Sequence, residues 1–372
     1  MTRCDVLVVG GGPAGSCAAW AAAGAGASTI LVERKKRYGV PVQCGEYFPT
    51  LATSMQMMPR ATGLPELMGL VEDHCARASP TLDILSPRGR RYSLPFSGMG
   101  IFRDRFEAAL AARAHDVGAQ THTGVTVRRI EGLLGGGPVE VETNRLGTIS
   151  ANVVIGADGP QSLVRRTLGL PDPQILAPCA QFGFAGEFSD ATELYFGEVA
   201  PGGYAWVIPK CDGANIGVGV QPQFSRMPLR KVLEHFLRRL GLQDTTPIYG
   251  NGGWVPCSGP IHSTAKGRAL LAGDAAGMVM ASNGGGMLTA MLAGREAGRT
   301  AADHLHHGIA LSTYEVRWKE QMGDLLHHSL VTKQLADRFF GNDRILELIM
   351  RLMGPRAMLR AVSCKRLYPF LP

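Results

Sequence analysis

The chain has 372 residues, of which 45% are apolar and 19% are charged, and its formal net charge is +7. This length suggests about two domains, and the composition excludes a disordered chain. The basic residues are dispersed apart from a run at 34–37, which we expect to form a solvated loop, with a docking patch as the alternative. No nucleic-acid-binding module is recognisable, so no nucleic-acid partner is expected.

The eight cysteines contain no C-x-x-C pair and no regular spacing, which favours a reducing compartment over a disulfide framework. Residues 10–32 are rich in Gly and Ala but contain Pro13, and they parse as a turn, a helix and a strand rather than as a membrane span. The first predicted strand begins at residue 4, which leaves no room for a signal peptide. We therefore expect a cytoplasmic protein.

The first predicted unit is a strand, a glycine-rich turn and a helix. Residues 4–9 form an apolar, β-branched run typical of a buried parallel strand, and an Ala-rich helix follows at 13–23. Between them, Gly10, Gly12 and Gly15 match the G-x-G-x-x-G spacing, in which missing side chains permit a tight turn, close approach to a pyrophosphate and helix packing. Free N–H groups in the first helical turn favour a phosphate there.

A second strand at 28–32 ends at Glu33, which lies 18 residues after Gly15. A carboxylate in this position accepts hydrogen bonds from ribose hydroxyls and repels a 2′-phosphate. A second glycine-rich turn, GDAAG at 273–277, follows an apolar strand predicted at 269–272. Because ligands gather at the carboxyl ends of parallel strands, the two turns together predict a two-part FAD site.

Between the two turns the pattern of the sequence changes. Residues 39–60 interrupt the α/β pattern, and a helix predicted at 101–114 resumes it. Residues 125–149 predict a small antiparallel meander, which a buried strand at 152–155 follows. Residues 171–260 alternate in polarity and are punctuated by Gly and Pro, which predicts an antiparallel sheet.

After the second turn the chain is predicted to be helical, first at 286–304 and again within 325–362. Near the end of the first helix lie three histidines that we expect to interact with the helix dipole, so no metal site is predicted: His304, His306 and His307. The later region has an apolar stripe at helical spacing, formed by Ile345, Leu348, Ile349 and Leu352. We expect this stripe to pack on the body of the protein, and contact with a membrane surface is the alternative.

These elements predict an α/β fold with an α+β insert. A discontinuous Rossmann-type FAD-binding domain is expected at 1–60, 99–170 and 262–308, a substrate-binding domain with an antiparallel sheet at 61–98 and 171–261, and a C-terminal helical region at 309–372.

Five segments resemble the geranylgeranyl reductase type of FAD-dependent oxidoreductase, within the wider p-hydroxybenzoate hydroxylase-like flavoprotein group. They are GGGPAG at 10–15 with Glu33, RDRFE at 103–107, GADGPQSLVR at 156–165, GDAAG at 273–277 and NGGGM at 283–287. Two further segments, QCGE at 43–46 and YAWVIPK at 204–210, resemble the reductases in particular. The likeness covers nearly all of residues 1–305, and Ala281 stands where many relatives carry proline.

The resemblance implies FAD as the cofactor. The residues expected to contact it are Gly10, Gly12, Pro13, Ala14, Gly15, Glu33, Arg34, Cys44, Gly45, Arg103, Val127, Asp158, Gly159, Gly273, Asp274, Gly285, Gly286 and Met287.

The resemblance also implies catalytic roles for Cys44, Tyr204 and Trp206. Reduced flavin would deliver a hydride to one carbon of an isoprenoid double bond, and the other carbon needs a proton. Cys44 is the candidate proton donor or flavin-side positioner, and a small buried packing residue is the alternative. Tyr204, Trp206 and Ile208 share one face of a strand, which either walls a channel for a prenyl chain or forms a sheet core.

Three nearby residues have less specific roles. Glu46 is expected to be a structural hydrogen-bonding residue, with a proton relay as the alternative. Lys210 either caps a strand end or binds an anionic headgroup, and Cys257 is expected to be a core thiol rather than a substrate contact.

The function expected from this likeness is reduction of prenyl double bonds in a lipid or isoprenoid. The alternatives are an aromatic monooxygenase or halogenase, which shares the scaffold and a similar aromatic strand, and a flavoprotein carrying electrons to quinone. Because no second dinucleotide fingerprint occurs, the electrons are expected from transiently docked NAD(P)H or from ferredoxin, which a basic surface suits. Peripheral contact with the inner face of the membrane would give access to a lipid substrate.

Overall fold

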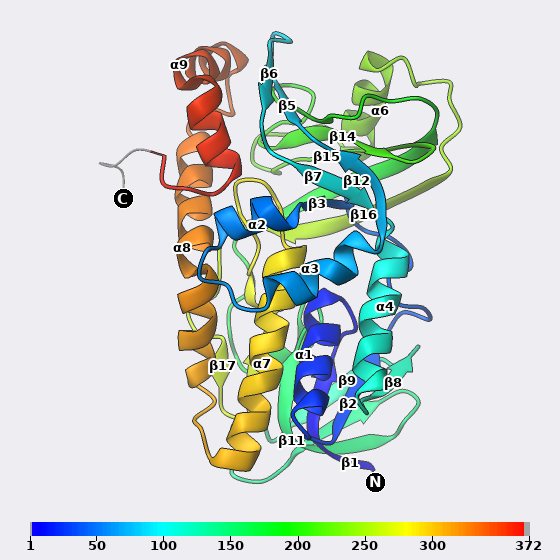
Figure 1. Ribbon diagram of the computed structural model, residues 1–372, viewed down its shortest axis with the longest axis vertical. Helices are drawn as coiled ribbons and strands as arrows, with labels where there is room; N and C mark the ends of the chain where they lie inside the picture. Colours follow the sequence, from blue (N-terminus) through cyan, green and yellow to red (C-terminus); the bar gives the residue numbers. More distant parts are fainter. Residues whose placement is uncertain (1, 368–372) are drawn as a thin grey trace.

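The computed structural model describes residues 2–367, and its two large sheets lie at opposite ends of an elongated molecule (Figure 1). The N-terminal strand belongs to the lower sheet in this view. Helices of the last part of the chain run along one side and connect the two ends. The α/β class predicted from the sequence is confirmed.

The first sheet carries both glycine-rich turns. Its strands are β1 (Thr2–Val9), β2 (Thr29–Glu33), β8 (Gln120–Thr123), β9 (Val127–Glu131), β10 (Val139–Thr143), β11 (Thr148–Gly156), β17 (Ala265–Lys266) and β18 (Ala269–Leu271). The order is β17-β18-β11-β1-β2-β8, and the pairs from β18 to β8 are all parallel. The predicted apolar strands are confirmed, and the predicted meander consists of β9, β10 and the start of β11, to which β10 pairs antiparallel.

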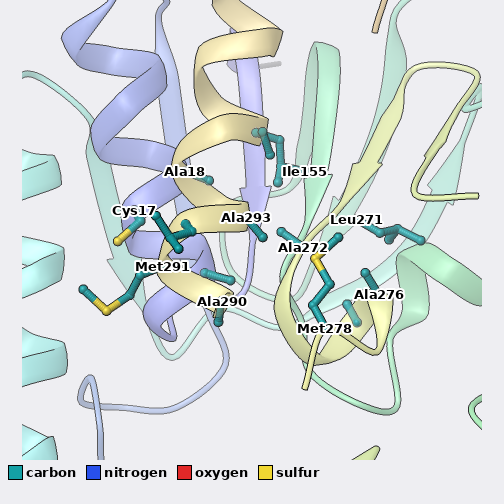
Figure 2. Packing of buried hydrophobic residues seen from close by; sticks show 14 of the residues in the cluster. Cys17, Ala18, Ile155, Leu271, Ala272, Ala276, Met278, Ala290, Met291 and Ala293 are labelled. Atoms are coloured by element: carbon teal, nitrogen blue, oxygen red, sulfur yellow. The ribbon is translucent and has the colours of Figure 1, made fainter. Parts of the chain in front are cut away.

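Helix α1 (Pro13–Gly24) packs against both α4 (Arg103–Asp116) and α7 (Met287–His307) beside this sheet. Helix α7 approaches α1 closely because two of its residues lack side chains. A Cβ on Gly294 would lie 1.9 Å from the carbonyl oxygen of Ala14, and a Cβ on Gly298 would lie 2.2 Å from that of Ala18. Figure 2 shows the small apolar side chains, including Ala18, Ala290 and Ala293, that fill this contact.

The second sheet is formed by β5 (Leu82–Leu85), β6 (Arg91–Leu94), β12 (Leu176–Ala185), β13 (Thr192–Tyr195), β14 (Tyr204–Lys210), β15 (Gly213–Gly219) and β16 (Tyr249–Pro256). Its order is β16-β12-β15-β14-β13-β5-β6, and only the β5–β13 pair is parallel. The antiparallel sheet predicted for residues 171–260 is thus confirmed. Helix α6 (Leu229–Arg239) covers one face, where Phe236 packs with Ala205 and Val207 of β14.

Short elements connect the two sheets. Strands β3 (Tyr47–Pro49), β4 (Cys75–Ser79) and β7 (Gly98–Ile101) form a third sheet. Helices α2 (Leu51–Met57) and α3 (Leu64–Glu72) lie between β3 and β4 in the sequence. Helix α5 (Leu163–Thr167) follows β11, and the 3-10 helix η1 (Gly273–Ala276) follows β18. The helix predicted to start at Ile101 starts at Arg103 instead, because Ile101 pairs with Cys75 in the third sheet.

The C-terminal helices are α8 (Thr313–Ala336) and α9 (Asp343–Val362), and α9 is broken at Gly354, whose φ is 61°. The packing predicted for its apolar stripe is wrong for three of its four residues: Ile345, Leu348 and Leu352 are 45%, 55% and 72% exposed, whereas Ile349 is half-buried. The helix instead buries Leu346 and Met350 on another face. Residues 368–372 lie outside the described part. No helix between residues 2 and 367 combines the length and apolarity that a bilayer crossing requires.

The contact of α1 with α7 predicts that Gly298→Ala lowers the free energy of unfolding by about 1–3 kcal/mol. The added Cβ cannot fit 2.2 Å from a carbonyl oxygen unless the helices separate. Urea unfolding measures the change. Gly323→Ala on α8 is the control, because its Cβ would meet Lys319 at an ordinary 3.5 Å, and it should keep or raise stability by up to about 1 kcal/mol. Equal stability of the two variants would contradict the close approach.

Candidate active site

A cavity of about 480 Å³ lies between the first sheet and the uncovered face of the second. It is lined by segments far apart in the sequence, including both glycine-rich turns, residues 43–49, β14 and the start of α7. The predicted site residues in its wall are Gly12, Pro13, Ala14, Arg34, Cys44, Gly45, Arg103, Asp158, Gly159, Tyr204, Trp206, Asp274, Gly285, Gly286 and Met287. The fold therefore brings most of the predicted site together.

The predicted residues that do not line the cavity are Gly10, Gly15, Glu33, Val127 and Gly273. Two of these glycines keep the first turn compact, because a Cβ on Gly15 would lie 1.7 Å from the oxygen of Gly10, and one on Gly10 would lie 2.3 Å from that of Ala157. Val127 begins β9 opposite Thr143. Gly273 begins η1 with a φ of 63°, which suits glycine.

Glu33 lies directly behind the first turn. Its carboxylate accepts hydrogen bonds from the backbone N–H of Gly11, at 2.6 Å, and of Lys35, at 2.7 Å. Each oxygen has a further lone pair, so the carboxylate retains capacity for a ribose hydroxyl. In the protein alone it fixes the turn and the loop after β2.

The first turn suits a pyrophosphate. A Cβ on Gly12 would meet no atom within 4 Å, so this backbone borders open space, and Gly12 and Ala14 both line the cavity. The turn leads into α1, whose first N–H groups have no acceptor within the helix and attract an anion. The residues present therefore fit the phosphate part of FAD.

Asp158 and Asp274 supply acceptors on the cavity wall. Asp158 Oδ2 accepts from the N–H of Leu163 and Val164, at 2.7 and 3.3 Å, whereas its buried Oδ1 has no partner among residues 2–367. Burial raises the pKa of Asp158. Burial also raises the pKa of Asp274 to about 6, and nearby Arg103 opposes that shift. An unpartnered buried carboxylate oxygen fits a site that receives hydroxyl donors from a bound cofactor.

Arg165 connects the turns that carry these two carboxylates. Its side chain is fully buried and donates to the carbonyl oxygens of Pro160, at 2.9 Å, and Ala275, at 3.0 Å. It also forms an ion pair with Asp172. One guanidinium thus fixes the spacing of the loops after β11 and β18.

Cys44 lies where the residues before β3 meet the start of α7. Its Sγ accepts a hydrogen bond from the N–H of Glu46 at 3.1 Å and lies 4.0 Å from Sδ of Met287. The adjacent Gly45 permits close packing on β14, because a Cβ there would lie 2.9 Å from Ile208 and 3.3 Å from Nε1 of Trp206. The thiol and the aromatic strand therefore border one small region.

Glu46 is the centre of a buried polar network beneath this region. Its carboxylate pairs with Lys210 at 2.7 Å and accepts from the Tyr249 hydroxyl at 3.1 Å and from Asn215 Nδ2 at 3.2 Å. Asn215 in turn accepts from Trp206 Nε1 at 2.8 Å. These contacts support the structural role expected for Glu46. They engage the Lys210 ammonium, so they give no support to a headgroup site there.

Strand β14 presents two different faces, as its period of two predicts. Tyr204, Trp206 and Ile208 line the cavity, whereas Ala205 and Val207 belong to the core under α6. The Tyr204 hydroxyl donates to the carbonyl oxygen of Asn283 in the turn before α7. The face shared by the three larger residues is thus a cavity wall. Cys257, expected to be a core thiol, is buried but also lines this cavity.

Several residues of the wall were not predicted from the sequence. They include Cys179, Phe196, Gln221, Lys333 and Phe340. No motif or spacing marks them, and Lys333 and Phe340 come from the C-terminal helical region, which carried no site prediction. Cys179, Phe196 and Gln221 lie within the segment predicted as the substrate-binding domain, which was the only signal for them.

The raised pKa of Asp274 predicts that apoprotein stability depends on pH. A carboxyl whose pKa is about 6 when folded and 3.8 in the reference state binds more protons when folded, so its contribution to stability falls as pH rises from about 4 to 6. Asp274→Asn should therefore raise apoprotein stability at pH 7 by on the order of 1 kcal/mol and weaken FAD binding. Urea unfolding at pH 4.5 and 7, with flavin titration, measures both. A variant destabilised equally at both pH values would contradict this assignment.

The chain is similar to known proteins in both sequence and structure. A profile described as FAD binding domain matches residues 3–193, and one described as geranylgeranyl reductase catalytic domain matches residues 177–255. Digeranylgeranylglycerophospholipid reductase 2 of Methanopyrus kandleri is 35% identical over 89% of this chain and 86% of its own length. The reductase of that name from Methanocaldococcus jannaschii is 32% identical over 94% and 90%.

Solved structures share the fold. A geranylgeranyl bacteriochlorophyll reductase-like protein from Thermoplasma acidophilum superposes with a TM-score of 0.83, at 24% identity, over 100% of this chain and 98% of that one. A flavin-dependent halogenase superposes with a TM-score of 0.70, at 19% identity, over 94% and 67%. With a cavity that fits FAD and reductase relatives matched over most of their length, the chain belongs to the geranylgeranyl reductase family of FAD-dependent oxidoreductases.

Proposed function

We propose that this enzyme saturates carbon–carbon double bonds in the prenyl chains, of geranylgeranyl type, of a lipid or isoprenoid. The observation that carries the proposal is the continuity of the cavity. The first glycine-rich turn, Cys44 and the apolar and aromatic face of β14 all line the same cavity. A long apolar chain can therefore lie against the same region that receives the flavin.

Bound reduced FAD supplies the hydride for one carbon of the double bond. The chain has to supply a proton to the other carbon and to exclude water. Cys44 is the proposed proton donor. Its thiol lies beside Met287, and the adjacent Gly45 packs on Trp206. Solvent then restores the proton to the thiolate. Trp206 and Tyr204 hold the chain and keep the region dry, and Asn215 and Asn283 fix their polar atoms.

The relatives support this activity over its alternatives. The two archaeal proteins described above are named for reduction of digeranylgeranylglycerophospholipid and match most of this chain at 32–35% identity. The halogenase is 19% identical to this chain, a likeness that shows a shared fold and gives no support to a halogenase activity. We therefore propose neither a halogenase nor a monooxygenase, nor an electron carrier to quinone.

Incubation of the reduced enzyme with geranylgeranyl lipids should add two hydrogens for each bond reduced, as mass spectrometry measures. Cys44→Ala should lower turnover by about 10²–10⁴-fold while FAD content stays unchanged, because the thiol is proposed to act only as the acid. Cys75→Ala, at an exposed position on β4 outside the cavity wall, is the control and should keep full activity. Absence of any mass gain with the wild-type enzyme would exclude the reductase, and an active Cys44→Ala would exclude its role as acid.

The electron donor is either NAD(P)H or a reduced ferredoxin. The net charge of +7 favours an acidic partner such as ferredoxin at low ionic strength. The rate at which each donor bleaches the flavin absorbance distinguishes them.

We further propose that the enzyme works at the inner, cytoplasmic face of a membrane and contacts it through α9. The exposed residues Ile345, Leu348 and Leu352 lie on one side of this helix, and basic residues flank them, including Arg344 and Arg351. An exposed apolar stripe beside basic residues suits the surface of an anionic bilayer. The stripe would hold the protein at the membrane that contains its lipid substrate.

Replacement of Leu348 and Leu352 together by serine should lower affinity for anionic lipid vesicles by about tenfold or more, since each leucine loses its transfer into the apolar interface. Vesicle flotation measures the change, and the fold should remain intact because both side chains are exposed. Leu134→Ser, at a 62% exposed position in the β9–β10 connection, is the control. If the double serine variant binds the vesicles as tightly as the Leu134→Ser control, α9 is not the contact surface.

A further inference from the structure

The cavity contains a ladder of aromatic side chains. It starts at Trp206 beside Gly45 and continues through Tyr204 and Phe196 to Phe340, with ring centroids 6.0, 6.0 and 6.3 Å apart. All four rings line the cavity. The ladder thus runs from the region of Cys44 to the connection between α8 and α9.

A polar cluster lies at the α8 end of the ladder, formed by Lys333, Asp337 and Gln221 and called here the α8 polar cluster. The Lys333 ammonium donates to Gln221 Oε1 at 2.9 Å and pairs with Asp337. Gln221 Nε2 donates to the other Asp337 oxygen at 2.8 Å and to the carbonyl oxygen of Gly202. Lys333 is only 4% exposed, and Lys333 and Gln221 both line the cavity.

The ammonium keeps one unused donor. Its three N–H groups have two acceptors, Gln221 and Asp337, and no third acceptor occurs among residues 2–367. Burial of a cation is costly unless its donors are satisfied. The apolar prenyl chain proposed above gives no acceptor, so the donor requires an oxygen from another part of the ligand.

The charges of the cluster define that oxygen. Asp337 neutralises Lys333, so the cluster has no net charge to attract a phosphate. A single N–H donor in a neutral setting suits an uncharged ether, hydroxyl or ester oxygen. In a prenyl lipid this is the oxygen that joins the chain to its polar end.

We infer that Lys333 is a specificity-determining residue that binds the uncharged oxygen at the polar end of the isoprenoid substrate. The chain then runs along the aromatic ladder, so that its double bonds reach the region of Cys44. The inference rests on the proposed reductase function and adds the direction in which the chain lies. It also places the polar end nearest α8 and α9, the side proposed to contact the membrane.

The experiment compares a tetraprenyl alcohol with a tetraprenyl hydrocarbon of the same length, both presented in detergent micelles. For the wild-type enzyme kcat/KM should be higher for the alcohol by about tenfold or more. Lys333→Met should raise KM for the alcohol by about the same factor and leave KM for the hydrocarbon unchanged. A purely structural role for Lys333 would shift both substrates equally, and that result would overturn the inference.

Lys319→Met is the matched control, because Lys319 also lies on α8 and also pairs with an acid at i,i+4 spacing, Glu315, but is exposed. It should change neither KM. If Lys333→Met does not fold with FAD because Asp337 is left unpaired, the double variant Lys333→Met, Asp337→Leu removes both charges and carries the same expectation.

The outcomes separate the two proposals. Reduction of neither substrate, together with no mass gain on geranylgeranyl lipids, would exclude the reductase function. Reduction of both with equal kcat/KM would keep that function and overturn the role of Lys333, whatever the variants do.

Discussion

The close packing of α1 on α7 is the contact on which the site depends. Gly294 lies against Ala14 and Gly298 against Ala18, so the helices run parallel with a fixed register. The register places the start of α7 about six residues, or roughly 9 Å, beyond the start of α1. Both helix starts line the cavity. Two helix N-termini in the wall of one cavity would suit an elongated cofactor that carries phosphates.

Buried polar groups then hold the remaining walls in place. Arg165 ties the loop after β11 to the loop after β18, and Glu46 ties the residues around Cys44 to β14, β15 and β16. Each of these two side chains is buried and has several partners, although Nε of Arg165 has none among residues 2–367. The partnered geometry is favoured because an alternative would leave a buried charge unpaired. The cavity is thus rigid where the cofactor and the reacting bond are proposed to lie.

The second sheet gives the cavity its chemical character. One face of β14 packs under α6, and the other provides Tyr204, Trp206 and Ile208 to the cavity. The aromatic ladder extends this wall to the C-terminal helices, where the α8 polar cluster adds an ammonium and an amide to the lining. A surface that is apolar along its length and polar at one end matches an isoprenoid attached to a polar group. Helix α9, which carries the exposed stripe, lies beside α8 on one side of the molecule (Figure 1).

The sequence by itself determined the class of the fold, the glycine-rich turns and the family resemblance. Gly10 has a φ of 101° and Gly15 leaves no room for a Cβ beside the oxygen of Gly10, so the turn requires glycine at these positions and its spacing could be recognised in the sequence. The period-two face of β14 follows from strand geometry in the same way. The strands at 4–9 and 269–272 could also be predicted from the sequence, because buried parallel strands are apolar throughout.

Only the tertiary structure decided which face of α9 is buried, because the helix has apolar residues on two sides and the body of the protein covers one. Only it placed Lys333 and Phe340 in the cavity wall, since neither belongs to a motif and both are more than 100 residues from β14 in the chain. It also showed that Glu33, Gly10 and Gly15 stand behind the cavity wall while Gly12 faces the open space. Contacts between distant segments depend on packing of whole elements, and no local pattern in the sequence records them.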